Sequence, residues 1–144
     1  MMASSVSRKT ITADHETAWQ YLLDREAWAV LMPGYLHHEI TSADEMIWVF
    51  KGDFGFVQKA VKLQLEVKER IEHEKIAFDL VGLSDNISGS GYFEVQQDEL
   101  IGQLEMKAGG FLASMINPVL ADIVPNLVEQ LVDAMATSLT TQNV

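Results

Sequence analysis

The chain contains no cysteine among its 144 residues. This absence excludes disulfide bonds, thiol nucleophiles and cysteine-ligated metal sites, and it agrees with a reducing compartment. Long hydrophobic runs are also missing. Although 48% of the residues are hydrophobic, none of them form the uncharged stretch of roughly 18 to 20 residues that a membrane-spanning helix needs. We therefore expect no transmembrane segment.

Positive charge is scarce. Ten Lys and Arg residues face 21 Asp and Glu residues, and the formal net charge is −11. Nucleic acids and anionic lipid surfaces attract clusters of basic side chains, so neither is expected as the main partner. The first residues place Arg8 and Lys9 behind small side chains and lack the apolar segment of a secretory signal. These features predict one cytoplasmic domain spanning residues 1–144.

The clearest pattern that is present lies between Lys59 and Glu69. Four apolar residues alternate there with polar ones: Val61, Leu63, Leu65 and Val67. A period of two predicts a strand in a sheet with one buried face. The segment 111–139 is the one later stretch long and apolar enough to cover such a sheet. We therefore expect a curved sheet that grips a helix, with the functional site in the gap between them.

The order of the expected elements predicts an α+β fold. A first strand over 4–12, suited to a sheet edge, precedes two short helices, one beginning near Asp14 and one over Glu26–Leu31. Six strands then follow, over 36–42, 46–54, 57–71, 75–83, 86–96 and 100–108. The turns between them are short and polar or contain glycine, as consecutive antiparallel hairpins require. The result is an antiparallel sheet of about seven strands.

A long helix is expected at the end of the chain, over Pro118–Thr140. Asn117 is suited to be its N-cap and Pro118 to occupy the first helical position. Pro125 would remove a backbone hydrogen bond seven residues later, so we expect the helix to kink or restart near Val124.

Two strand features have two interpretations each. Gly89 and Gly91 lie on one face of a predicted strand, where they either permit bending and close packing or leave room for a cavity. In the third strand Trp48, Phe50 and Phe54 share one face, and the other face is apolar as well. Either both faces are covered within the chain, or one meets a second copy, which leaves a homodimer open.

The titratable residues do not form a recognisable site. His37 and His38 are neighbours in a strand and point to opposite faces, so we expect no metal site, no cofactor and no assigned catalytic residue. Asp79 and Glu105 either face an interior, where they could serve as acid or base, or face solvent.

A series of short motifs resembles one family. Met32-Pro33-Gly34 follows Asp24, and after it come Glu39, Gly55, Gly89-x-Gly91 and the segment 109–113, Gly-Gly-Phe-Leu-Ala, before the long helix. In this order they are similar to the G-subunit family of carbon monoxide dehydrogenase over nearly the whole chain. The resemblance implies the helix-grip fold of the SRPBCC superfamily, which includes START-like lipid-binding domains and polyketide cyclases.

The resemblance also implies a role. It suggests an accessory protein to a molybdenum-containing carbon monoxide dehydrogenase or related hydroxylase, acting in its maturation, membrane association or electron-acceptor delivery, and a quinone-like ligand is compatible with that setting. The favoured function is non-catalytic binding of a small hydrophobic or amphipathic molecule, such as a lipid. The candidate ligand-binding residues, chosen by face, are Leu63, Leu65, Phe78, Leu80, Gly89, Gly91, Phe93, Met106, Phe111, Met115, Leu127 and Leu131.

Two alternatives remain. One is a polyketide cyclase-like enzyme that uses the same cavity, with an acid or base among His37, Asp79 and Glu105. The other is a structural module whose interior is filled by its own side chains.

Overall fold

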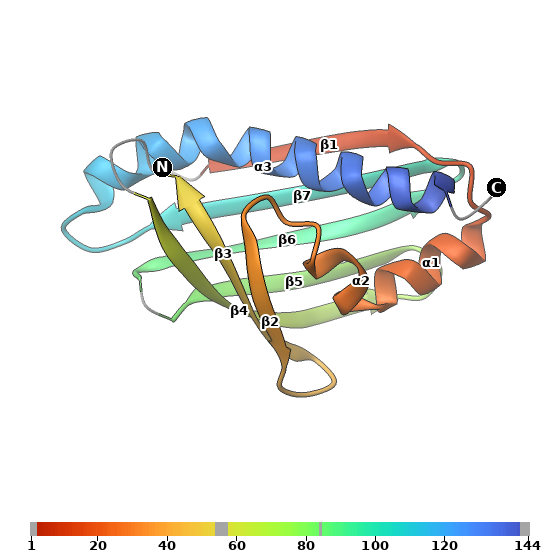
Figure 1. The fold of residues 1–144 in the computed structure, drawn as a ribbon, viewed down its shortest axis with the longest axis horizontal. Coiled ribbons are helices and arrows are strands. Elements are labelled where there is room, and N and C mark those ends of the chain that lie inside the picture. Colours follow the sequence, from red (N-terminus) through yellow and green to blue (C-terminus); the bar gives the residue numbers. More distant parts are fainter. Residues whose placement is uncertain (1–2, 54–57, 84, 142–144) are drawn as a thin grey trace.

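The computed structural model describes residues 3–53, 58–83 and 85–141. These residues form one antiparallel sheet of seven strands, in the order β1-β7-β6-β5-β4-β3-β2, with three helices (Figure 1). The strands are β1 (Ala3–Thr10), β2 (Tyr35–Ile40), β3 (Glu45–Asp53), β4 (Gln58–Ile71), β5 (Lys75–Gly82), β6 (Ile87–Gln96) and β7 (Glu99–Ala108). The helices are α1 (His15–Leu23), α2 (Arg25–Ala29) and α3 (Ala113–Thr141). The predicted α+β helix-grip architecture is therefore confirmed.

The sheet is a meander whose last strand returns to its first. Strands β2 to β7 pair in sequence order, and β7 then pairs with β1, so that β1 and β2 form the two edges. Two of the hairpin turns contain a non-glycine residue with positive φ, His73 at 64° and Gln97 at 52°. Phe54, expected to share one face of the third strand with Trp48 and Phe50, and Gly55 of the family motif lie outside the described residues.

Helix α1 begins where the sequence predicted. The side chain of Asp14 accepts a hydrogen bond from the Thr17 backbone N–H at 2.7 Å, the usual arrangement of an N-cap. This hydrogen bond lowers the pKa of Asp14 below its ordinary value. The buried residues of the helix are Ala18, Trp19, Tyr21 and Leu22.

Helix α3 begins four residues earlier than Asn117, so the N-cap assigned to that residue is wrong. The Asn117 amide instead pairs with the backbone of Ala108 at the end of β7. Its Oδ1 accepts from the Ala108 N–H at 2.8 Å, and its Nδ2 donates to the Ala108 carbonyl at 3.2 Å. The side chain thereby satisfies both backbone groups of a terminal strand residue.

Of the two outcomes expected near Val124, a kink or a restart, the restart is wrong, because α3 continues as one helix through Pro125. Proline leaves the carbonyl four residues earlier, that of Ala121, without its helical partner. Ala121 and Pro125 both lie on the exposed side of α3. Water can therefore satisfy that carbonyl, and the helix tolerates the loss of one backbone hydrogen bond.

Helix α3 lies along β1 and β7, over one half of the concave face of the sheet (Figure 1). It packs closely on β7 at Gly102, where a Cβ atom would collide with the side chain of Val132. Strands β3 and β4 rise on the other side of the concave face, opposite the N-terminal half of the helix (Figure 1). The two ends of the interior are filled differently as a result.

Candidate functional site

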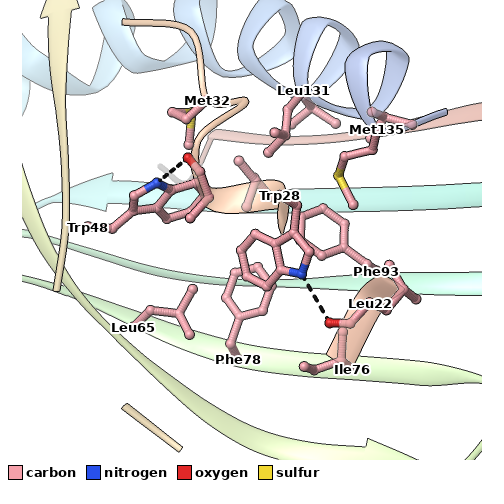
Figure 2. Packing of buried hydrophobic residues seen from close by; sticks show 14 of the residues in the cluster. Leu22, Trp28, Met32, Trp48, Leu65, Ile76, Phe78, Phe93, Leu131 and Met135 are labelled. Atoms are coloured by element: carbon pink, nitrogen blue, oxygen red, sulfur yellow. Dashed lines mark hydrogen bonds between the residues drawn. The ribbon is translucent and has the colours of Figure 1, made fainter. Parts of the chain in front are cut away.

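The C-terminal half of α3 covers a filled interior, which we call the closed end. Its centre is Trp28 of α2, which is fully buried and whose ring centroid lies 4.9 Å from that of Phe93, 5.6 Å from Trp48 and 6.0 Å from Phe78. Figure 2 shows these rings beneath Leu131 and Met135 of the helix. Aromatic and apolar side chains thus occupy the space between α3 and the sheet at this end.

Both tryptophans of the closed end have a hydrogen-bond acceptor within the described chain. The Trp28 Nε1 donates to the Leu22 carbonyl at 3.0 Å, and the Trp48 Nε1 donates to the Ala29 carbonyl at 2.9 Å (Figure 2). These bonds hold the rings against the backbone of α1 and α2. Because the polar atoms are satisfied, the closed end is a core and offers no free polar group of these rings to a ligand.

The N-terminal half of α3 borders an open space, the α3 cleft, with a volume of about 440 Å³. The helix forms one wall, the facing strands β3 and β4 form the other, and residues of β6 and β7 contribute to its floor. The side chains that form its apolar surface are Phe50, Val61, Ile87, Met106, Leu120, Ile123 and Leu127. Pro33 and Gly34, which precede β2, close one side of it.

Polar groups of the α3 cleft lie at its rim. Asp122, Asn126 and Gln130 recur every four residues along α3 and line the cleft with exposed side chains. Lys51 contributes from β3. The rim of this otherwise apolar surface therefore carries one positive side chain, one negative side chain and two amides. Such an arrangement suits a molecule with an apolar body and a polar end.

A second space, the tip hollow, surrounds the start of α3 and has a volume of about 380 Å³. Its apolar walls come mainly from the end of β7 and the first turns of the helix: Ala108, Phe111, Leu112, Met115, Ile116 and Val119. Lys59 and Asp85, whose side chains form an ion pair at 2.5 Å, line it as well. Ile87 borders both spaces, so the tip hollow and the α3 cleft are neighbours along the helix.

Comparison with known proteins decides the family. A sequence profile described as the G subunit of carbon monoxide dehydrogenase (CoxG) matches residues 8–140. The chain belongs to the CoxG family. The matched residues run from within β1, through all the other strands, to the last turn of α3. They therefore contain both walls of the α3 cleft. A comparison with curated protein sequences gives no match.

Solved structures agree with the fold of this CoxG-family chain. A conserved protein from Geobacillus kaustophilus superposes with a TM-score of 0.77 at 12% identity, covering 99% of this chain and 97% of the other. A START superfamily protein from Mycobacterium smegmatis gives 0.64 at 15% identity, with 99% of each chain covered. A Streptomyces aromatase/cyclase gives 0.55 at 12% identity, covering 99% and 89%. At such identities the likeness shows the fold alone.

Four of the twelve residues expected to bind a ligand line the two spaces of the CoxG-family chain. Met106 and Leu127 line the α3 cleft, and Phe111 and Met115 line the tip hollow. The other large apolar residues of that set are buried in the core and line neither space: Leu63, Leu65, Phe78, Leu80, Phe93 and Leu131. Sequence periodicity placed them on the inner face without showing that Trp28 covers part of it.

The two strand glycines among those twelve residues permit close packing. A Cβ atom on Gly91 would lie 2.7 Å from Leu104 Cδ2 and 2.9 Å from a ring carbon of Phe78, so neighbouring side chains already occupy the space. A Cβ on Gly89 would run into the backbone of Glu105. Neither glycine lines the α3 cleft or the tip hollow, which favours the bending and packing interpretation of this pair.

Several cleft residues were missed, although the sequence carried a signal for them. Val61 lies on the inner face of β4 that the alternation predicts, and Phe50 of β3 faces it across the strand pair. Ile123 and Leu127 are half-buried, whereas Val124 and Val128 beside them are buried. The helix is therefore rotated so that the edge of its apolar stripe, and not the centre, borders the cleft.

The acid and base candidates do not line either space. His37 and Asp79 are exposed, and Glu105 accepts a hydrogen bond at 3.3 Å from the Ser90 hydroxyl on the outer face of the sheet. His38 is on the inner face opposite Trp48, because a bulge shifts the register between Tyr35 and His37.

The polar contacts of His38 join β2 to α2. Its Nδ1 is hydrogen-bonded to the Tyr35 hydroxyl at 2.7 Å, and its Nε2 lies 2.9 Å from Glu26 Oε1. Both ring nitrogens are thus engaged by side chains of the chain itself, and the three residues stand outside the α3 cleft. This arrangement tethers the short helix to the edge strand.

Metal-ligand clusters and membrane-spanning helices are both absent from the described part of the chain. Residues 3–53, 58–83 and 85–141 contain no group of three His, Asp or Glu side chains placed to hold a metal ion. None of the described helices is long and apolar enough to cross a membrane.

Proposed function

We propose that this CoxG-family chain acts as a single helix-grip domain that binds a small, mainly apolar molecule with a polar end in the α3 cleft. The observation that carries the proposal is an apolar space of about 440 Å³ whose polar groups lie at the rim. Ligand pockets of proteins commonly have volumes of roughly 300 to 1,000 Å³ and combine apolar walls with a few polar groups. No cofactor or metal enters this proposal.

The lining suggests how such a molecule would lie. Its apolar body would contact Phe50, Val61 and Met106 below the helix, and burial of that body supplies most of the binding free energy. Its polar end would reach Lys51 or the Asn126 and Gln130 amides, which offer hydrogen-bond donors and acceptors. A quinone-like molecule or a lipid meets these requirements.

The family supports a biological setting for the proposal. In it the protein is a cytoplasmic accessory to a molybdenum-containing carbon monoxide dehydrogenase or related hydroxylase, as the description of the CoxG family suggests. The bound molecule would serve the maturation of that enzyme, its membrane association or its electron acceptor. A monomer and a homodimer are both compatible with the position of the α3 cleft.

A cyclase-like enzyme is the second candidate function. One observation favours it: Lys51 and Asp122 place two ionisable groups at the rim of an apolar cleft, where an acid and a base could act on a bound ketone. The enzyme would be supported if the wild type turned over cyclisable polyketide substrates and Asp122→Asn lost this turnover but still bound the ligand. Equal turnover in Asp122→Asn and the wild type would oppose this use of the cleft.

The binding proposal is tested by native mass spectrometry of gently purified protein, followed by identification of any co-purifying molecule and titration with an apolar fluorescent probe. Leu127→Trp would fill the cleft from its half-buried position, and we expect it to weaken probe binding by roughly tenfold or more. Val81→Trp, on the exposed outer face of β5, is the matched control and should bind like the wild type. Probe binding that is unchanged in Leu127→Trp would contradict the proposal.

A further inference from the structure

Three polar side chains form a connected series of hydrogen bonds between β2 and α2. The Tyr35 hydroxyl lies 2.7 Å from His38 Nδ1, and His38 Nε2 lies 2.9 Å from Glu26 Oε1. We call these three residues the Tyr35 relay. None of the three lines the α3 cleft or the tip hollow, so ligand binding as proposed above does not use them.

The hydrogen bonds of the Tyr35 relay run in one direction. An ionised carboxylate only accepts hydrogen bonds, so His38 Nε2 carries the hydrogen that Glu26 receives. In the neutral ring Nδ1 then has no hydrogen, and it accepts one from the Tyr35 hydroxyl. A hydroxyl bonded to a basic imidazole nitrogen, on a ring that a carboxylate orients, is the arrangement that activates a nucleophile.

The backbone around Tyr35 is irregular in a way that brings the hydroxyl to the imidazole. Residues three apart in a regular strand point to opposite faces. The register shift between Tyr35 and His37 instead allows the rings of Tyr35 and His38 to meet, with centroids 5.8 Å apart. Gly34, directly before Tyr35, has a φ of 78°, and a Cβ atom there would collide with the backbone of β3. Bulges are frequent beside active sites, where they redirect a side chain.

The Tyr35 relay is reachable from solvent and has apolar neighbours. Tyr35 is half-buried, and the side chains of His38 and Glu26 are 14% and 63% exposed. Val30 follows Glu26 by about one helical turn, and Ile40 follows His38 on the same face of β2. Both apolar side chains are exposed. They offer apolar surface near the relay to a group attached to the Tyr35 oxygen.

We propose that Tyr35 is a nucleophile that accepts an acyl group from an activated ester, with His38 as its general base and Glu26 as the positioning residue of the imidazole. The Tyr35 oxygen attacks the acyl carbon and forms a new C–O bond, and its proton passes to His38 Nδ1. The bond from the acyl carbon to the leaving-group oxygen breaks, and that oxygen takes the proton from His38. The products are an ester of the Tyr35 phenol and a free alcohol. This activity goes beyond the proposed function and does not depend on it.

The test is reaction of the full chain with p-nitrophenyl butyrate, followed by peptide mapping of the acyl group. We expect the label on Tyr35, in a form that hydroxylamine removes, as it removes aryl esters but not the amides of acylated lysines. Tyr35→Phe should abolish this label, and His38→Gln should slow its formation by roughly a hundredfold. Glu26→Gln should slow it less, and Glu26→Asp, which keeps a carboxylate, should react faster than Glu26→Gln.

Tyr92 is the matched control within the same chain. It is half-buried like Tyr35, but its ring lies beneath Lys75 Nζ at 4.6 Å. It should remain unlabelled over the time in which Tyr35 is acylated. Imidazole added to His38→Ala should restore part of the rate on Tyr35, because a small base can occupy the vacated position. A purely structural role of His38 would give no such rescue.

Four results would overturn the assignment: no label on Tyr35 in the wild type, equal labelling of Tyr35 and Tyr92, a wild-type rate in His38→Gln, or the acyl group on His38 itself. The last would make the histidine the nucleophile. A melting temperature for each variant verifies that it is folded. The reaction is measured without the apolar fluorescent probe, and the probe titration without the ester, so failure of the acylation and failure of the ligand site are distinguishable.

Discussion

The two ends of α3 differ in what faces them. At the closed end, buried residues such as Leu131 and Met135 pack on an aromatic cluster supplied partly by α2. At the other end, Ile123 and Leu127 of the same helix border an open cleft, and Phe111 and Met115 are exposed. One continuous helix thus covers a filled core over its second half, whereas over its first half it combines core residues such as Val124 with residues that border a cavity.

Because of this difference, one half of α3 contributes mainly to stability and the other half offers a place for a ligand. A filled core contributes free energy through burial and dispersion contacts, whereas an open cleft leaves apolar surface in water until a ligand covers it. The short helix α2 produces the asymmetry, because Trp28 enters the concave face beneath only one half of α3. Substitutions at the two ends should accordingly have different consequences, and the following variants test this from the largest effect to the smallest.

Trp28→Ala should have the largest effect on stability. Removing this fully buried side chain leaves a cavity among Trp48, Phe78 and Phe93 and should lower the free energy of unfolding by about 3 to 5 kcal/mol. Urea denaturation measures the change, and Trp28→Phe, which keeps a ring, should lose less. A loss under about 1 kcal/mol for Trp28→Ala would mean that the closed end is not the stabilising core.

Two leucines one turn apart compare the ends directly. Leu131 is buried in the core and Leu127 is half-buried at the α3 cleft. Leu131→Ala should lower the free energy of unfolding by about 2 to 5 kcal/mol, and Leu127→Ala by roughly 1 kcal/mol. Urea denaturation gives both values under the same conditions. Equal losses at the two positions would remove the distinction between a filled and an open end.

Glu129→Gln should have the smallest effect, since the carboxylate whose charge it removes is largely exposed. Glu129 accepts hydrogen bonds from Lys9 Nζ at 2.7 Å and from the Ser7 hydroxyl at 3.0 Å, joining α3 to β1. These bonds, that from Lys9 foremost, lower the pKa of Glu129. Its contribution to stability is therefore present above the ordinary glutamate pKa and lost as the pH falls through the lowered value.

Urea midpoints measured across the acidic range test this pH dependence. Glu129→Gln should be slightly less stable at neutral pH, and its stability should fall less steeply with acidification than that of the wild type. Asp122→Asn, elsewhere on α3, serves as the control for removal of a carboxylate. Parallel curves for Glu129→Gln and the wild type would show that the link to β1 does not contribute.

Local patterns predicted the elements well and the start of the last helix poorly. Alternation such as that over Val61–Val67 specifies strands because successive side chains point to opposite faces of a sheet. The pairing of Asn117 and Pro118 satisfied the local rule for an N-terminus, yet the Asn117 side chain is used by Ala108. A contact between a helix residue and the end of a strand can displace a capping rule, and no local pattern reports it.

The amino-acid sequence by itself determined the α+β class, the order of the strands along the chain and the inner face of β4, because periods of 2 and 3.6 residues follow from backbone geometry. Four of the ligand-binding candidates chosen from it line the two spaces: Met106, Phe111, Met115 and Leu127. The tertiary structure decided which inner-face residues are core and which border a cavity. That outcome depends on where Trp28 packs and how α3 is rotated over β7, and both are set by long-range packing that sequence spacing does not record.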